Sequence, residues 1–417
     1  MHTNNLPVNA GRKVICVYNA IYQNKNRIKH FYKRGSVSDF SNINTYLMQA
    51  KQELSVCNYN EVDALVLAQL SYYPFEIVIK RDKISVPELA EELMQIPDFE
   101  SAYSQDKQTF IKELVRCKRY SHREIYRMQS IRTQDTRWAA FTIDAGQNDT
   151  AIIVMRGTGK TTVGWAEDFR LGYQVMGTGA QLASFRYLKG TDARKIYLTG
   201  HSKGGNNVSS AFAISNPKVR DKVVRIDNFD GPGVNPEFAE NYSDGYNELG
   251  GKLRNFYPEG SVIGLLLTDN PGETSFIKTS LRESYQNSPL LGQHDPFAWE
   301  VKGNSLVRTK QSLTSEMLND TLDELIQMTT LTQRYYLVKL IERMGIPAIL
   351  SGEIQGMAAR LTAIICGLTE AGKEEREALF YAVLAFLKAL ARRVKEWIAT
   401  RVDVLQVNRK LNLNCLP

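Results

Sequence analysis

The stretch Ile196-Tyr-Leu-Thr-Gly-His-Ser-Lys-Gly-Gly205 decides the fold, because it joins a strand pattern directly to a helix pattern. Its first four residues are apolar or β-branched, as in a buried strand. Residues 208–214 are small or apolar and suit a buried helix. Ser202 falls at the junction, with a glycine two residues to either side. Side chains at those two positions would collide with neighbouring elements, so the pattern predicts a sharp strand–turn–helix that presents Ser202.

Strand and helix patterns alternate on both sides of this turn. Residues 84–130 have helical patterns, and polar or Gly/Pro-rich turns separate the strands that follow. The predicted strands are Trp138–Ile143, Ala151–Met155, Lys195–Thr199, Lys222–Ile226 and Lys252–Tyr257. Such alternation predicts an α/β protein with a mostly parallel central sheet that helices cover on both faces.

The chain divides into three parts by pattern. Residues 1–60 are Asn-rich and Lys/Arg-rich and are expected to form an N-terminal extension or accessory cap. A helical pattern begins at Glu61, where the central domain, residues 61–311, is expected to start. Residues 312–417 are almost wholly helical in pattern.

Composition narrows the class of protein. Hydrophobic residues make up 43% and charged residues 23% of the 417 residues, so a globular chain with a sizeable core is expected. The net charge of +7 is modest, and no nucleic-acid partner is predicted. The first apolar stretch, Val14–Ile21, is too short and too polar for a cleavable signal peptide, and the longest apolar run, Ala378–Leu387, is too short to span a membrane. A cytoplasmic protein, or one exported without a cleavable signal peptide, is expected.

A serine hydroxyl becomes a nucleophile when a base removes its proton, and after a turn of this kind the acid and then the histidine follow the serine in the chain. His294 is the one histidine after Ser202. His201 is the other candidate, but its place beside the serine on the turn directs its side chain away from the nucleophile. We therefore predict His294 as the general base.

Three carboxylates could orient that histidine. Asp230 ends the strand after the serine helix, on the side where active-site loops gather in open parallel sheets. Glu259 follows the next strand, and Asp269 lies in a later loop. We favour Asp230 and keep Asp269 and Glu259 as alternatives.

The loop after the strand Ala151–Met155 admits two interpretations. Gly157-Thr-Gly-Lys-Thr-Thr162 resembles the end of a phosphate-binding loop, but that motif requires a glycine where the chain has Val154. The same loop is suited to an oxyanion hole, in which Thr158 and the backbone N–H of Lys203 would bind the developing charge. Trp165 and Asp168 are expected to anchor it.

Several motifs together resemble a known family. Arg156-Gly-Thr158, Trp165-x-x-Asp168, Gly200-x-Ser202-x-Gly204 and His294 resemble the class-3 lipases in kind and order. The segments 63–72, 200–206, 229–233 and 293–299 look more closely like the bacterial Mbeg-like family of lipase-related α/β hydrolases. This resemblance implies an α/β-hydrolase fold and acyl-ester hydrolysis without a metal or organic cofactor. Lys203 stands where class-3 lipases usually have leucine, which predicts a substrate different from theirs.

The sequence thus predicts a serine hydrolase, a lipase, phospholipase or esterase that degrades lipids through an acyl-enzyme on Ser202. A hydrolase-like scaffold that binds a partner without turnover is the alternative. The helical tail carries an apolar stripe with flanking cations: Phe380, Val383, Leu384, Leu387, Leu390, Val394 and Trp397, with Lys388, Arg392, Arg393, Lys395 and Arg401. We expect the stripe to pack against the catalytic domain or a second subunit; peripheral membrane contact is the other interpretation.

Overall fold

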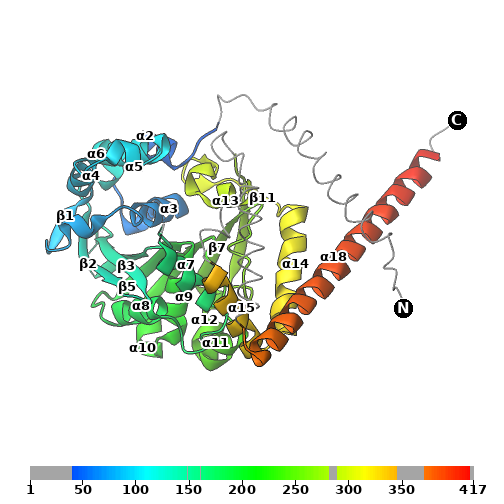
Figure 1. Ribbon diagram of the computed structural model, residues 1–417. Coiled ribbons are helices and arrows are strands. Elements are labelled where there is room, and N and C mark those ends of the chain that lie inside the picture. The colour runs from blue at the N-terminus through cyan, green and yellow to red at the C-terminus, as the bar shows by residue number, and fades with distance from the viewer. Residues whose placement is uncertain (1–39, 148, 160, 281–288, 345–370, 414–417) are drawn as a thin grey trace, which may run out of the picture. The chain divides into compact units, whose positions relative to one another are not determined.

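The computed structural model describes residues 40–147, 149–159, 161–280, 289–344 and 371–413 (Figure 1). They contain a nine-stranded sheet in the order β1-β2-β3-β4-β5-β6-β7-β8-β11 and a small β9–β10 hairpin. The strands are β1 (Lys83–Ser85), β2 (Glu124–Arg132), β3 (Arg137–Asp144), β4 (Thr150–Met155), β5 (Lys195–His201), β6 (Val223–Phe229), β7 (Leu253–Pro258), β8 (Glu273–Ile277), β9 (Val301–Lys302), β10 (Ser305–Leu306) and β11 (Arg308–Thr309). Strands β4 to β8 are parallel, whereas the pairs from β1 to β4 and the pair β8–β11 are antiparallel.

Helices cover both faces of this sheet. The α-helices are α2 (Ile43–Gln49), α3 (Glu61–Leu70), α4 (Val86–Met94), α5 (Phe99–Ala102), α6 (Gln105–Arg116), α7 (Thr162–Arg170), α8 (Gly179–Lys189), α9 (Lys203–Ile214), α10 (Pro217–Arg220), α11 (Pro236–Asn241), α12 (Ser243–Glu248), α13 (Pro289–His294), α14 (Leu313–Met328), α15 (Leu331–Met344) and α18 (Lys373–Leu413). Short 3₁₀ helices are η2 (Val56–Asn58), η3 (Phe75–Val78), η4 (Lys118–Tyr120), η5 (Leu249–Gly251) and η7 (Pro296–Ala298). Both α3 and α9 pack against β4, β5 and β6, and they belong to two separate hydrophobic cores. The fold is that of the α/β hydrolases.

The five predicted strands are confirmed as β3 to β7, each within three residues of its predicted ends. The physical basis is plain in β4, whose six residues Thr-Ala-Ile-Ile-Val-Met are all buried. A continuous apolar strand of this kind needs cover on both faces, which parallel sheets with flanking helices provide.

The helical prediction for residues 84–130 is wrong at both ends, since its first two residues belong to β1 and its last residues belong to β2. Ile125 and Met128 are the two buried apolar residues of β2, and they stand three positions apart, as on a helix face. A shift in register between Tyr126 and Gln129, with Arg127 at φ 50°, explains the spacing. A β-bulge adds one residue to the strand and so disguises the two-residue period of the pattern.

The hydrophobic core begins before residue 61, the boundary expected from the sequence. Ile43, Tyr46, Leu47 and Leu54 are buried in the same core as α3, and α2 packs on α6. Buried Asp63 of α3 fastens this region, since its carboxylate accepts hydrogen bonds from Tyr46 at 2.7 Å, from Tyr120 at 2.8 Å and from Arg119 Nε at 2.8 Å. Residues 1–39 lie outside the described residues.

The C-terminal part is helical as predicted in its described residues, as α14, α15 and α18 (Figure 1). The buried guanidinium of Arg334 on α15 donates to the carbonyl oxygens of Gly172 and Thr329, both at 2.9 Å. An ion pair of 2.8 Å joins Arg170 on α7 to Glu342 on α15. Helix α18 packs on α14 and α15. Within the described ranges, none of the helices is both long and apolar enough to cross a membrane.

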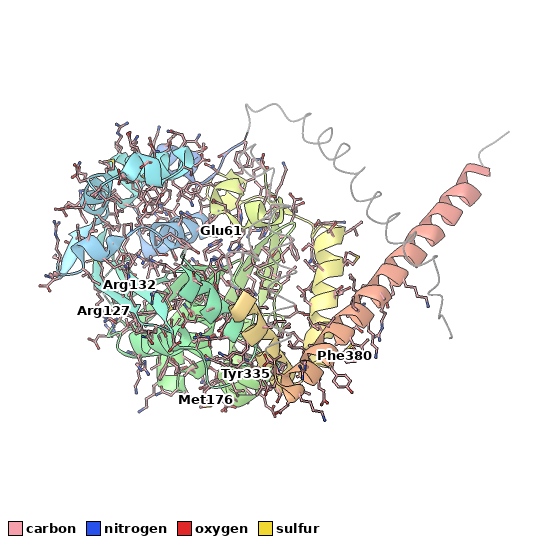
Figure 2. The ribbon with its side chains drawn as sticks, viewed as in Figure 1. Glu61, Arg127, Arg132, Met176, Tyr335 and Phe380 are labelled. Atoms are coloured by element: carbon pink, nitrogen blue, oxygen red, sulfur yellow. The ribbon has the colours of Figure 1, made fainter. Side chains whose placement is uncertain are left out.

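The apolar stripe predicted on this tail does not form the packed face of α18. Phe380, Val383 and Leu387 expose 64%, 50% and 54% of their surface, and Figure 2 labels Phe380 on the outer side of the helix. Alanines and one leucine form the buried face instead: Ala378, Leu379, Ala382, Ala385 and Ala389. Small residues let two helices approach closely, so they take the contact face although larger apolar residues are present. The packed-stripe expectation is wrong for these three residues.

Candidate active site

Ser202 lies on a strained turn between β5 and α9. Its backbone has φ 58° and ψ −132°, a conformation that costs a non-glycine residue about 1–3 kcal/mol. A Cβ at Gly200 would lie 2.3 Å from the carbonyl carbon and oxygen of Gly204, and one at Gly204 would lie 2.2 Å from the carbonyl oxygen of Met155. The two glycines are therefore required by close backbone approach, as the sequence pattern predicts. Strain at one defined residue is typical of functional sites.

The structure brings Asp230 to His294. Asp230 Oδ2 lies 2.6 Å from His294 Nδ1, and its other oxygen, Oδ1, accepts hydrogen bonds from Ser261 Oγ and from the Gly264 N–H. Asp230 is buried and sits directly after β6 at φ 49°. This carboxylate can orient the imidazole and balance a positive charge on it.

The two alternative acids have other partners. Glu259 Oε1 accepts hydrogen bonds from the N–H and the hydroxyl of Thr279, both at 3.2 Å. Asp269 accepts a hydrogen bond from Tyr246 through its backbone carbonyl at 2.9 Å. Neither carboxylate is paired with His294 in the hydrogen bonds of the described residues.

His201 packs beneath His294. Its ring centroid lies 4.4 Å from that of His294, and its Nε2 lies 2.8 Å from the His294 carbonyl oxygen. A carbonyl only accepts, so Nε2 carries the proton and Nδ1 accepts from the hydroxyl of Tyr72 at 2.8 Å. Burial, together with the nearby charge of His294, lowers the pKa of His201 well below its ordinary value, so this ring is neutral. His201 is thus a support for His294 through the hydrogen bond to its carbonyl oxygen.

Tyr72 ends the segment 63–72, and the sequence pattern assigns it no role. Besides bonding His201, its side chain forms a hydrogen bond with that of Ser202, which lowers the Tyr72 pKa, although burial and the charges of Asp168 and Asp295 raise it overall. A Cβ at Gly157 would lie 2.0 Å from the Tyr72 hydroxyl. The glycine before Thr158 therefore leaves the space that Tyr72 occupies, and this pairing is the signal that sequence reasoning missed.

Side chains of η3 and α7 anchor the loop after β4. Arg156 forms an ion pair of 2.6 Å with Glu76 and lies 4.5 Å over the ring of Phe75. The hydroxyl of Thr158 donates to Asp168 Oδ2 on α7, as the expected anchoring by Asp168 requires. The described residues of this loop run directly into α7, whose first turn is capped by Thr161; Lys160 lies outside them.

Lys203 directs its side chain into the protein rather than toward a substrate. Only 1% of that side chain is exposed, and Nζ lies 3.0 Å from Glu167 Oε2 and 3.5 Å from Asp168 Oδ1. The prediction that this lysine changes the substrate therefore has no support in the structure, because its ammonium group contacts two carboxylates of the protein. Its backbone N–H remains at the start of α9, where the helix dipole favours negative charge.

Comparison with known proteins identifies the family to which this chain belongs. The sequence matches the family model described as Mbeg1-like over residues 114–342. No curated protein matches the chain.

Similar solved structures are fungal lipases. Lipase II from Rhizopus niveus is 18% identical over 36% of this chain, with a TM-score of 0.27, and the match spans 65% of that lipase. Lip2 lipase from Yarrowia lipolytica is 12% identical over 47% of this chain and 84% of its own, with a TM-score of 0.31. The native Rhizomucor miehei lipase propeptide complex is 13% identical over 71% of this chain and 89% of its own, with a TM-score of 0.33. The family model spans more than half of the chain, and the protein therefore belongs to the Mbeg1-like family.

Proposed function

We propose that the protein is a serine hydrolase that cleaves carboxylic esters of lipids through an acyl-enzyme on Ser202. The observation that carries the proposal is the 2.6 Å contact between Asp230 and His294 near a serine on a strained strand–helix turn. A buried carboxylate on one imidazole nitrogen leaves the other nitrogen to take a proton, which is the arrangement that activates a serine hydroxyl.

In the proposed reaction Ser202 Oγ attacks the ester carbonyl while its proton passes to His294 Nε2. Asp230 stabilises the imidazolium that forms, and the backbone N–H groups of Thr158 and Lys203 donate to the tetrahedral oxyanion. The alcohol leaves with the proton from His294. Water then repeats the sequence on the acyl-enzyme and releases the acid and free Ser202.

The lipid class of substrate is supported by the resemblance of the motifs to class-3 lipases. The exposed apolar residues of α18 support it as well, because they offer a surface that an acyl-lipid aggregate could contact. Acylglycerols and phospholipids are therefore the substrates to assay first.

A fluorophosphonate probe tests the proposal, because only an activated serine reacts with it readily. The full-length chain should be labelled and should hydrolyse members of an acylglycerol and phospholipid panel. Ser202→Ala should abolish labelling and lower kcat by about 10⁵-fold or more. A folded wild-type protein that is neither labelled nor active would instead favour the non-catalytic scaffold, and ordinary turnover by pure Ser202→Ala would remove the serine from its role.

A further inference from the structure

We infer that the buried side chain of Lys203 is a positioning residue that ties the two sides of the oxyanion hole together, acting through Asp168 on Thr158. The inference rests on the proposed function and adds to it a side chain whose backbone N–H alone enters the proposed reaction. It starts from an unusual feature: a lysine directly after the nucleophile, with 1% of its side chain exposed.

Three of the four groups that Lys203 Nζ contacts lie on α7, and the fourth lies at the start of β3. Besides its two carboxylate contacts, Nζ donates to the carbonyl oxygens of Arg137 at 3.2 Å and Gly164 at 3.5 Å. Gly164, Glu167 and Asp168 all belong to α7, which follows the Thr158 loop. Lys203 is therefore the physical link between the first residue of α9 and the segment that carries Thr158.

The two carboxylates depend on this ammonium group to different degrees. Glu167 also accepts hydrogen bonds from the N–H groups of Ala180, at 2.8 Å, and Arg137, at 3.1 Å. Asp168 Oδ1 is buried and accepts no hydrogen bond from the described residues, so the charge of Lys203 at 3.5 Å balances it. Burial raises the pKa of Asp168 to about 6, while the Lys203 charge and the Thr158 hydroxyl act to lower it.

Loss of the Lys203 ammonium group would therefore also disturb the hydrogen bond of Thr158. A buried carboxylate without a counter-charge takes up a proton or moves toward solvent. Either response alters the acceptor to which the Thr158 hydroxyl is bonded, and the loop then loses its fixed distance to the Lys203 N–H. Backbone approach here is tight, since a Cβ at Gly204 would lie 3.0 Å from the Gly157 nitrogen. A small displacement of the loop is thus enough to misalign the two donors.

The test is a double-mutant cycle on the full chain, with kcat and KM measured per labelled site after titration with a fluorophosphonate. Lys203→Met should lower kcat by about 30-fold with KM changed less than about twofold, a part of the 10²–10³-fold effect of losing one oxyanion donor. Thr158→Val should lower kcat by about 10-fold alone and by much less in the Lys203→Met background, since both act on one contact. Lys252→Met is the matched control, because its ammonium likewise donates to two backbone carbonyls, those of Arg220 and Val223, and lies 5.6 Å from the centroid of the Phe212 ring.

Three outcomes separate the hypotheses. Wild-type kcat per labelled site in Lys203→Met, or additive effects in the cycle, would overturn the positioning role while the proposed function stands. If the wild-type protein is not labelled, the proposed function itself is wrong. If Lys203→Met does not fold, Asp168→Asn takes its place: it removes the carboxylate that transmits the effect and should show the same kcat loss and the same lack of additivity with Thr158→Val.

Discussion

Helices α9 and α18 reverse the usual relation between composition and burial. Residues Lys203 to Ala213 of α9 are all buried, although they include one lysine, two asparagines and two serines. In the described part of α18, by contrast, Phe380, Tyr381, Val383 and Leu387 are exposed. The hydrophobicity of a residue therefore predicts its environment poorly in both helices.

The difference follows from what each helix joins. Helix α9 begins at the strained serine and packs between α8, α12 and the strands β4 to β6, so its polar side chains lie inside the protein. Asn206, for example, donates to the carbonyl oxygens of Pro232 and Gly233 at 3.1 and 2.7 Å. Helix α18 needs only one face for α14 and α15. Changes to buried polar groups near α9 should therefore have large effects, and changes to the exposed face of α18 should have small effects on folding.

Asp230→Asn should have the largest effect, about a 10⁴-fold loss of kcat with the fold retained. An amide keeps an oxygen for Ser261 and Gly264, but it places an N–H₂ or a neutral oxygen against His294 Nδ1 and no longer stabilises the imidazolium. Steady-state kinetics on a soluble ester check this. Glu259→Gln and Asp269→Asn are the controls and should retain turnover; full activity in Asp230→Asn would remove it from the acid's role.

Glu76→Gln should lower the free energy of unfolding by about 3 kcal/mol near neutral pH. Burial would raise the Glu76 pKa, but the hydrogen bonds and charge of Arg156 prevail and lower it from 4.5 to about 2. A lowered pKa means that the stabilisation is present above about pH 4.5 and is lost as the pH falls through about 2. Urea unfolding at several pH values should therefore show the difference between wild type and variant shrinking over that window.

The control for this experiment is Glu92→Gln. Glu92 pairs with Arg81 on the surface, where the side chains are 42% and 47% exposed, and such pairs contribute little. An equal loss of stability in both variants would show that burial of the Arg156 pair has no special value.

Tyr72→Phe should lower kcat by about 10-fold, or roughly 1.4 kcal/mol, with KM nearly unchanged. The ring stays in its edge contact with His201, at 5.7 Å between centroids, but His201 Nδ1 loses its donor and the Ser202 side chain loses its hydrogen bond with Tyr72. The hydrogen bond from His201 to the carbonyl oxygen of His294 is then weakened, while the side chain at residue 72 keeps its shape. Tyr73→Phe is the matched control, since it removes a partly buried hydrogen bond of 2.7 Å to the Lys107 carbonyl. Equal kcat losses in the two variants would indicate a general packing effect.

The central strands and the serine turn could be predicted because local rules decide them: buried runs such as β4 and the glycines at 200 and 204. The candidate pair of Asp230 and His294 could be named from chain order alone, but the choice against Glu259 and Asp269 depends on which loops meet in space. Burial of the Lys203 ammonium could not be predicted, because it requires Glu167 and Asp168 to lie beside it. The bulge at Arg127 obscured the strand pattern of β2 for a related reason, because the register of a strand depends on the strand with which it pairs.

The smallest effect on folding is expected for the triple variant Phe380→Ser, Val383→Ser, Leu387→Ser. These side chains are at least half exposed, so thermal unfolding and turnover of a soluble ester should stay close to wild type. We propose that this face contacts anionic lipid, because exposed Lys388 and Lys395 follow it on α18 and can attract an anionic surface. Liposome flotation should show salt-sensitive binding of the wild type to anionic vesicles and its loss in the triple variant. Met176→Ser, which removes a residue 63% exposed elsewhere, should still float (Figure 2). Unchanged flotation of the triple variant would contradict lipid contact at this face, and a change in sedimentation would assign it to a second copy of the chain.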